Sequence, residues 1–210
     1  MITIRQIERL FNDQQWVRLH HELMSNRPEG AHQPPHAHGS PAAPPRGLCG
    51  VVPVAAMAMI RMDELSQAGH PFYRRLLNVI FTSQQSDGGW GDPCVTALCV
   101  RALVAGAGSG AAIHGGLGYL AALQKSEGAW PKEPIRRLPA DGFASAFILH
   151  QLGEFAQFRD AVRFADAITW FTSHARELDD DAQRLWSHAK TRCRLATTYR
   201  PAPLFSPRAA

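Results

Sequence analysis

The sequence has few features of a disulfide-stabilised, secreted or membrane-spanning protein. It contains four cysteines, Cys49, Cys94, Cys99 and Cys193, and no Cys-x-x-Cys pair of the kind that binds zinc or cycles between redox states. It lacks an uninterrupted apolar run of about 18 residues, which a membrane-spanning helix needs. The charged and apolar regions of a signal peptide are also missing from the N-terminus. We therefore expect a cytoplasmic protein with reduced thiols and no transmembrane segment.

Strong charge of one sign is absent as well. The 210 residues include 22 lysines and arginines against 18 aspartates and glutamates, a formal net charge of +4. The basic residues are dispersed, apart from Arg136-Arg137 and the stretch from Lys190 to Arg194. Nucleic-acid grooves concentrate basic residues along one face, so we expect no nucleic-acid partner. The length is enough for one domain with a sizeable core.

The sequence also lacks convincing strand patterns. Apolar residues instead recur at helical spacing along most of the chain. Glycine and proline breaks divide these periodic segments into about eight helices. The predicted helices cover residues 3–24, 51–65, a segment through Phe72 and Ile80, 93–104, a segment ending near Gln124, 142–152, 157–177, and a last one reaching about Ala196. This pattern predicts an all-α protein of about three to four helical hairpins.

Two segments carry no such periodicity. Residues 26–47 are rich in proline and contain His32, His36 and His38, a composition that buries too little apolar surface to order itself. Residues 199–210 are the second such segment. We expect a loop at 26–47 and a disordered tail at 199–210. The predicted domains are an N-terminal amphipathic helix (1–25), the loop (26–47), a repeat domain (48–198) and the tail (199–210).

A seven-residue motif occurs twice, with its two copies forty residues apart. Gln84 to Trp90 reads QQSDGGW, Gln124 to Trp130 reads QKSEGAW, and helix patterns flank each copy. The matching positions hold a glutamine, an acidic residue, a glycine and a tryptophan: Gln84, Asp87, Gly88, Trp90, Gln124, Glu127, Gly128 and Trp130. A fixed period in the range of about 20–50 residues indicates a repeat architecture.

This Gln-x-x-[Asp/Glu]-Gly-x-Trp pattern resembles the QW motif of squalene–hopene and oxidosqualene cyclases and the related repeats of protein prenyltransferase β subunits. The resemblance covers about residues 51–172. It implies a partial α/α toroid in which each motif joins an outer helix to the next inner helix. It further implies that the glutamine and acidic side chains cap neighbouring helix ends, with the tryptophan stacked on the glutamine. These motifs are structural, so the resemblance implies a fold rather than a particular reaction.

The resemblance to cyclases also suggests a catalytic acid. Class II cyclases use the middle Asp of an Asp-x-Asp-Asp motif, a carboxylic acid kept protonated by apolar surroundings. The nearest match here, Glu177-Leu178-Asp179-Asp180, makes Asp179 and Asp180 the candidate catalytic residues. This run lies in a third, degenerate junction at 174–181 that lacks the Gly-x-Trp core. In the alternative interpretation the same acidic run is the N-cap of the last helix.

Prenyltransferases of this superfamily hold zinc with an Asp-x-Cys pair that opens one inner helix and a histidine that opens the next. Asp92 and Cys94 match the pair, but Ala144 stands where the resemblance places the histidine, and His150 lies further along that helix. A catalytic zinc site needs three ligands and an open position. We therefore expect no bound cofactor, with Asp92 as a helix N-cap and Cys94 as a core thiol. A zinc site that includes these two residues is the alternative.

Three to four hairpins form an open arc with a concave face and two exposed ends, whereas a complete toroid is closed. Trp90, Trp130 and Phe143 are the candidate ligand-binding residues on the concave face, although aromatic residues at this spacing are also typical of a core. The expected function is a non-catalytic binding or scaffold module. It would engage a protein partner, a second copy of itself or an apolar, isoprenoid-like ligand. The alternative is an isoprenoid-handling enzyme related to terpene cyclases or prenyltransferases.

Overall fold

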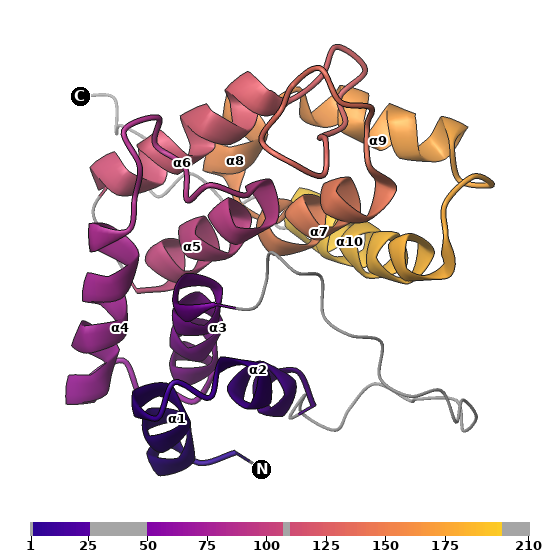
Figure 1. Ribbon diagram of the computed structural model, residues 1–210. Helices are drawn as coiled ribbons and strands as arrows, with labels where there is room; N and C mark the ends of the chain where they lie inside the picture. Colours follow the sequence, from indigo (N-terminus) through magenta and orange to yellow (C-terminus); the bar gives the residue numbers. More distant parts are fainter. Residues whose placement is uncertain (1, 26–49, 107–109, 199–210) are drawn as a thin grey trace, which may run out of the picture. The chain divides into compact units, whose positions relative to one another are not determined.

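Figure 1 shows a computed structural model of the chain, which describes residues 2–25, 50–106 and 110–198. The predicted loop at 26–47 and the predicted tail at 199–210 lie outside these described residues. Within the described ranges every regular element is an α-helix and no strand is present, so the predicted all-α class is confirmed. None of the helices in these ranges is long and apolar enough to cross a membrane.

The chain forms two compact units, Met1–Ala122 and Leu123–Ala210. The first contains α1 (Ile4–Asn12), α2 (Trp16–Ser25), α3 (Val51–Glu64), α4 (Pro71–Thr82), α5 (Pro93–Ala105) and most of α6 (Gly110–Leu123). The second contains α7 (Gly142–Leu152), α8 (Ala156–Ala161), α9 (Phe164–Ser173) and α10 (Asp180–Thr198), and α10 packs along α7 (Figure 1). Helices α3 to α7 lie where the sequence pattern predicts them, and the predicted domain boundaries stay a prediction.

Helix α3 is central to the first unit, because it packs against α1, α2, α4 and α5. Val54, Met59 and Met62 are among its fully buried side chains. A helix enclosed on most sides is apolar around most of its circumference rather than along one stripe. This enclosure explains the almost continuous apolar run VVPVAAMAMI in its sequence.

The predicted single helix at 3–24 is wrong, because this segment forms two helices, α1 and α2, joined by residues 13–15. Gln14 has a φ of 55°, in the left-handed region that few non-glycine residues adopt. Phe11 then packs edge-on against Trp16, with ring centroids 4.9 Å apart. Since both helices pack on α3, the apolar periodicity continues across the break and conceals it.

The predicted helix at 157–177 is also wrong, since α8 ends at Ala161 and α9 begins at Phe164. Val162 is extended between them, with φ −118° and ψ 164°. The Arg163 N–H therefore leaves the helical ladder and donates to Gln124 Oε1 at 2.8 Å. A partner 39 residues away in sequence replaces the helical bond, which local periodicity does not predict.

Candidate ligand pocket at the third helix junction

The two copies of the motif form the same turn. In the first copy the Gln85 N–H donates to the Gly89 carbonyl and the Gly88 N–H donates to the Gln85 carbonyl, both at 2.9 Å. The second copy repeats both bonds at residues 125–129, also at 2.9 Å. The motif therefore specifies one backbone conformation at the end of α4 and again at the end of α6.

The glycine of each motif is required by both its backbone angle and its surroundings. Gly88 and Gly128 have φ values of 87° and 95°, which L-residues with side chains rarely adopt. A Cβ atom on Gly88 would lie 2.5 Å from the Gly115 carbonyl oxygen of α6. A Cβ atom on Gly128 would lie 2.4 Å from the Ala167 nitrogen of α9. Each turn thus lies directly on the backbone of a following helix.

The motif glutamines bond each turn to that following helix. Each glutamine Nε2 donates to the glycine carbonyl of its own turn, at 2.8 Å for Gln84 and 2.6 Å for Gln124. Gln84 Nε2 also donates to the Ala112 carbonyl of α6 at 2.9 Å. Gln124 bonds both backbone groups of Arg163, the N-cap of α9, so it caps a neighbouring helix as the resemblance implies.

We expected the acidic residues of the motif to cap a neighbouring helix, and this expectation is wrong for the two bonds that the structure shows. Asp87 Oδ1 accepts the Gly89 N–H at 2.9 Å and so closes its own turn. Glu127 is exposed and lies 3.9 Å from the Lys125 ammonium group. Ion pairs near the protein surface contribute about 0–1 kcal/mol to stability. The acidic residue therefore stabilises the turn more in the first motif, where it accepts a backbone N–H, than in the second.

The motif tryptophans belong to the core. Trp90 is 6% exposed, and its indole N–H donates to the Ile80 carbonyl at 2.8 Å. Trp130 is fully buried and stacks on Phe158, with ring centroids 6.1 Å apart. A ligand could reach either ring only by displacing its packing partners. Phe143, the third aromatic candidate, is half-buried.

Two hydroxyl residues that the sequence analysis missed complete these junctions. The Trp90 N–H donates to Thr96 Oγ1 at 3.0 Å, and the Trp130 N–H donates to Ser145 Oγ at 2.8 Å. Both hydroxyl residues are fully buried. Each follows the N-cap aspartate of its helix by four positions in the sequence, a shared spacing that could have identified them.

Helices α5, α7 and α10 all begin at a capping aspartate. Asp92 Oδ1 accepts the N–H groups of Cys94 and Val95 at 2.7 and 3.0 Å. Asp141 and Asp179 each accept one backbone N–H of the first helical turn at 2.7 Å. The predicted N-cap roles of Asp92 and of the acidic run before α10 are therefore confirmed, and Asp141 caps α7 in the same way.

The candidate catalytic residues Asp179 and Asp180 are both exposed. A carboxylic acid that protonates an alkene needs apolar surroundings to keep its proton near neutral pH. Asp179 has instead a backbone N–H donor and solvent around it. Asp179 and Asp180 lie at the N-terminus of α10. This position agrees with the alternative interpretation, in which the acidic run caps the last helix.

The candidate zinc ligands do not form a metal site with other described residues. Asp92 uses Oδ1 for its two helix N–H groups, and Cys94 is buried in the first turn of α5. Ala144 offers no ligand atom, and the His150 ring lies 6.1 Å from that of His188 on α10. In the part of the chain that the structure describes, no group of three or more His, Cys, Asp or Glu residues could hold a metal ion.

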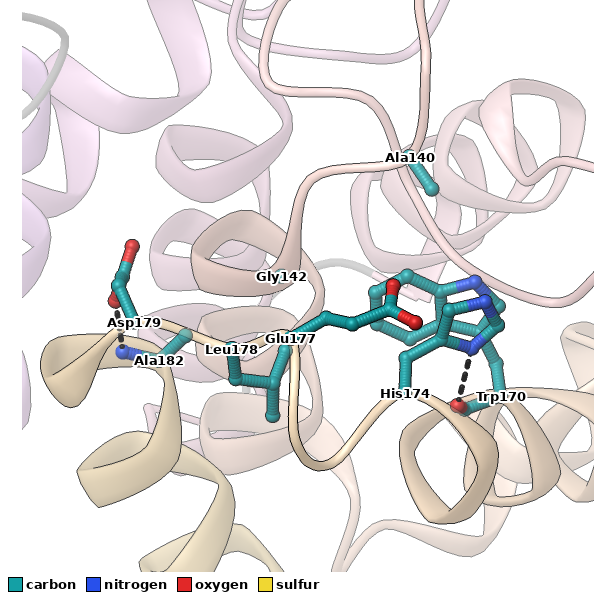
Figure 2. A pocket seen from close by; sticks show the side chains of 8 residues that line it. All are labelled: Ala140, Gly142, Trp170, His174, Glu177, Leu178, Asp179 and Ala182. Atoms are coloured by element: carbon teal, nitrogen blue, oxygen red, sulfur yellow. Dashed lines mark hydrogen bonds between the residues drawn. The ribbon is translucent and has the colours of Figure 1, made fainter.

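The third junction, residues 174–179 between α9 and α10, contains a cavity of about 180 Å³. Figure 2 shows the side chains that line it. The lining includes Gly142, Trp170, His174, Glu177, Leu178 and Asp179. They come from the start of α7, the end of α9 and the connection that follows it. The first junction spans residues 83–92 and encloses its tryptophan, whereas the third is shorter and open.

Trp170 and His174 form one wall of this cavity. Their rings stack with centroids 4.6 Å apart and planes inclined by 17°. His174 Nδ1 lies 2.9 Å from the Trp170 carbonyl oxygen. A carbonyl only accepts, so Nδ1 carries the hydrogen and a neutral ring keeps Nε2 as an acceptor.

Glu177 supplies a negative charge in the lining of the pocket. Figure 2 shows its side chain extending in the direction of the stacked rings. Its carboxylate forms no ion pair with any side chain in the described ranges. The sequence pattern identified Asp179 and Asp180 at this junction, with Glu177 only as the first residue of the same acidic run, and it did not identify Trp170 or His174. The missing Gly-x-Trp core was the available signal that the junction is not filled as the other two are.

Comparisons with known proteins found no matching family model, no similar curated protein and no similar solved structure. The resemblance to QW-repeat proteins therefore stays an expectation that rests on the two motifs.

Proposed function

We propose that this chain is a helical-repeat binding module of the QW type, and that it holds a side chain of a protein partner in the pocket of the third junction. One observation carries this proposal: two junctions are closed by the same set of bonds, and the third opens into a pocket with an acidic lining. A repeat that closes its core twice and leaves the third position open has a defined place for a ligand.

The partial toroid is part of this proposal. The motif turns join α4 to α5 and α6 to α7, and the third junction joins α9 to α10. We propose that the first helix of each pair is an outer helix and the second an inner helix. The shared N-cap aspartates of α5, α7 and α10 support this assignment.

The size of the pocket favours a protein side chain over an isoprenoid. Pockets for drug-sized small molecules occupy about 300–1,000 Å³, whereas this cavity has about 180 Å³. Its lining also mixes carboxylates and an imidazole with apolar groups. The exposed positions of Asp179 and Asp180 favour binding over acid catalysis.

A test of this proposal uses the N-acetyl amides of lysine, arginine, glutamate and norleucine as side-chain probes. The indole N–H signals of the tryptophans are followed by ¹⁵N NMR on the full chain, and Trp170→Phe assigns the signal of the pocket. We expect saturable movement of the Trp170 signal with at least one probe, while the signals of buried Trp90 and Trp130 stay in place. No saturable movement with any of the four would overturn the proposal.

Turnover assays with farnesyl and geranylgeranyl diphosphate separate binding from catalysis. We expect no product from the purified chain. Product formation that is lost in both Asp179→Asn and Asp180→Asn, with unchanged thermal unfolding, would show an enzyme in place of a binding module.

A further inference from the structure

The polar groups that line the third-junction pocket are mainly hydrogen-bond acceptors. Glu177 contributes a carboxylate, and Asp179 has one oxygen beyond the Oδ1 that accepts the Ala182 N–H. In its neutral form His174 adds Nε2 as an acceptor, because its Nδ1–H is used on the Trp170 carbonyl. A ligand that satisfies these groups must bring several N–H or O–H donors.

The pocket also has an uncompensated negative charge. Neither lysine nor arginine is among the residues that line it. Arg184 pairs with Asp181 and Arg192 pairs with Glu154, whereas exposed Arg176, which precedes Glu177 in the chain, is not among the lining residues. A cation entering the pocket would meet the Glu177 carboxylate without displacing an ion-pair partner, and the second oxygen of Asp179 adds negative charge to the lining.

The aromatic wall suits a cation as well. Ammonium and guanidinium groups are attracted to the faces of aromatic rings, most strongly to tryptophan. This unit already contains two such contacts, Lys190 Nζ at 5.7 Å from the Trp186 ring centroid and the Arg159 guanidinium at 5.8 Å from that of Phe164. Trp170 supplies the same kind of ring in the lining: one of its faces stacks on His174, and the Glu177 side chain extends toward the two rings, whereas the Asp179 carboxylate points away from them (Figure 2).

We infer that the third-junction pocket binds the cationic end of a lysine or arginine side chain from a protein partner. This inference rests on the proposed function and specifies its ligand. Anionic ligands are disfavoured by Glu177 and Asp179, and an isoprenoid chain is disfavoured by the cavity volume and the polar lining. A metal ion lacks a third ligand among the described residues.

The same four probes test this inference on the full chain, because norleucine matches the lysine stem without its charge. We expect the lysine and arginine amides to move the Trp170 indole signal saturably, and the glutamate and norleucine amides to leave it in place. Movement by the glutamate or norleucine amide alone would overturn the inference and leave the proposed function standing. No movement with any probe would overturn both.

A matched pair of variants locates the charge. Glu177→Gln removes one exposed carboxylate of the pocket while keeping its shape, and we expect it to raise the Kd of the lysine amide about fivefold, which corresponds to about 1 kcal/mol. Glu133→Gln removes the same charge at another exposed position of the unit, and we expect a change within about twofold. Equal Kd values for Glu177→Gln and Glu133→Gln would overturn the assignment of the cation site.

Discussion

The closed junctions and the open third junction begin the helices after them in the same way, with a capping aspartate, but differ in the turn before the cap. At the closed junctions a glycine with positive φ lets the turn lie on a helix backbone, and a tryptophan fills the space below. The third junction has Gln183 where Thr96 and Ser145 stand in the others, and Gln183 is exposed. Capping is thus enough to start a helix, whereas closing the junction needs the Gly-x-Trp core and a buried hydroxyl.

The largest effect should come from the motif glycines. Gly128→Ala and Gly88→Ala each add a Cβ at an unfavourable φ and within 2.5 Å of helix backbone. We expect each to lower the free energy of unfolding by about 3 kcal/mol, from backbone strain together with overpacking. Urea unfolding followed by circular dichroism measures this change.

Gly69→Ala is the matched control for the motif glycines. It is exposed, and a Cβ atom there meets no atom within 4 Å. We expect its unfolding free energy to stay within about 0.5 kcal/mol of the wild-type value. If Gly128→Ala proved as mild as Gly69→Ala, the close approach between turn and helix would not be what closes the junction.

A smaller effect is expected from the glutamine of the second motif. Gln124 is 2% exposed and makes three hydrogen bonds, to the carbonyl of Gly128 and to both backbone groups of Arg163. Gln124→Ala leaves these groups without their partner, and we expect a loss of about 2 kcal/mol in unfolding free energy.

Gln183→Ala removes a glutamine from the open junction, at the position that Thr96 and Ser145 occupy in the closed ones. Gln183 is exposed and donates to the Leu178 carbonyl at 3.1 Å. Water can replace that bond, so we expect a change within about 0.5 kcal/mol. Equal losses for the two glutamines in thermal and urea unfolding would remove the distinction between closed and open junctions.

Helix starts could be predicted from the sequence because their signals are local. An aspartate before proline or glycine places the cap of α5 and of α7 within a few residues, and the structure has those caps. The break before α9 could not be predicted, since it depends on Gln124 bonding Arg163 across 39 residues. The turn at Gln14 was hidden because α1 and α2 both pack on α3.

The candidate site was predictable only in part, because only some of its residues belong to a local sequence pattern. Asp179 was identified from its acidic neighbours, a local pattern. Trp170 and His174 lie at the end of α9, whereas Gly142 begins α7, and tertiary packing brings these two segments together. The ring stack of Trp170 and His174 has a four-residue spacing, which any helix produces, so the spacing alone does not distinguish a pocket wall from a core face.

The smallest effect is expected at Asp92, where capping and zinc binding predict different results. Serine caps a helix about as well as aspartate does, but it is a far poorer zinc ligand. If Asp92 acts only as a cap, Asp92→Ser should keep the unfolding free energy within about 0.5 kcal/mol, while Asp92→Ala should lose about 1 kcal/mol. Asp179→Ser and Asp179→Ala should show the same pair of values, because both aspartates accept backbone N–H groups of the first turn.

Chelation completes this test, since a bound metal adds stability of about RT ln(1 + [L]/Kd). Treatment of the purified chain with a chelator should leave its Tm unchanged if Asp92 and Cys94 are structural. A fall in Tm on chelation, reproduced by Asp92→Ser and by Cys94→Ser but absent in Asp179→Ser, would contradict that assignment. It would mean that the first junction binds zinc through a further ligand, and that the closed junctions differ from the open one in metal chemistry as well as in packing.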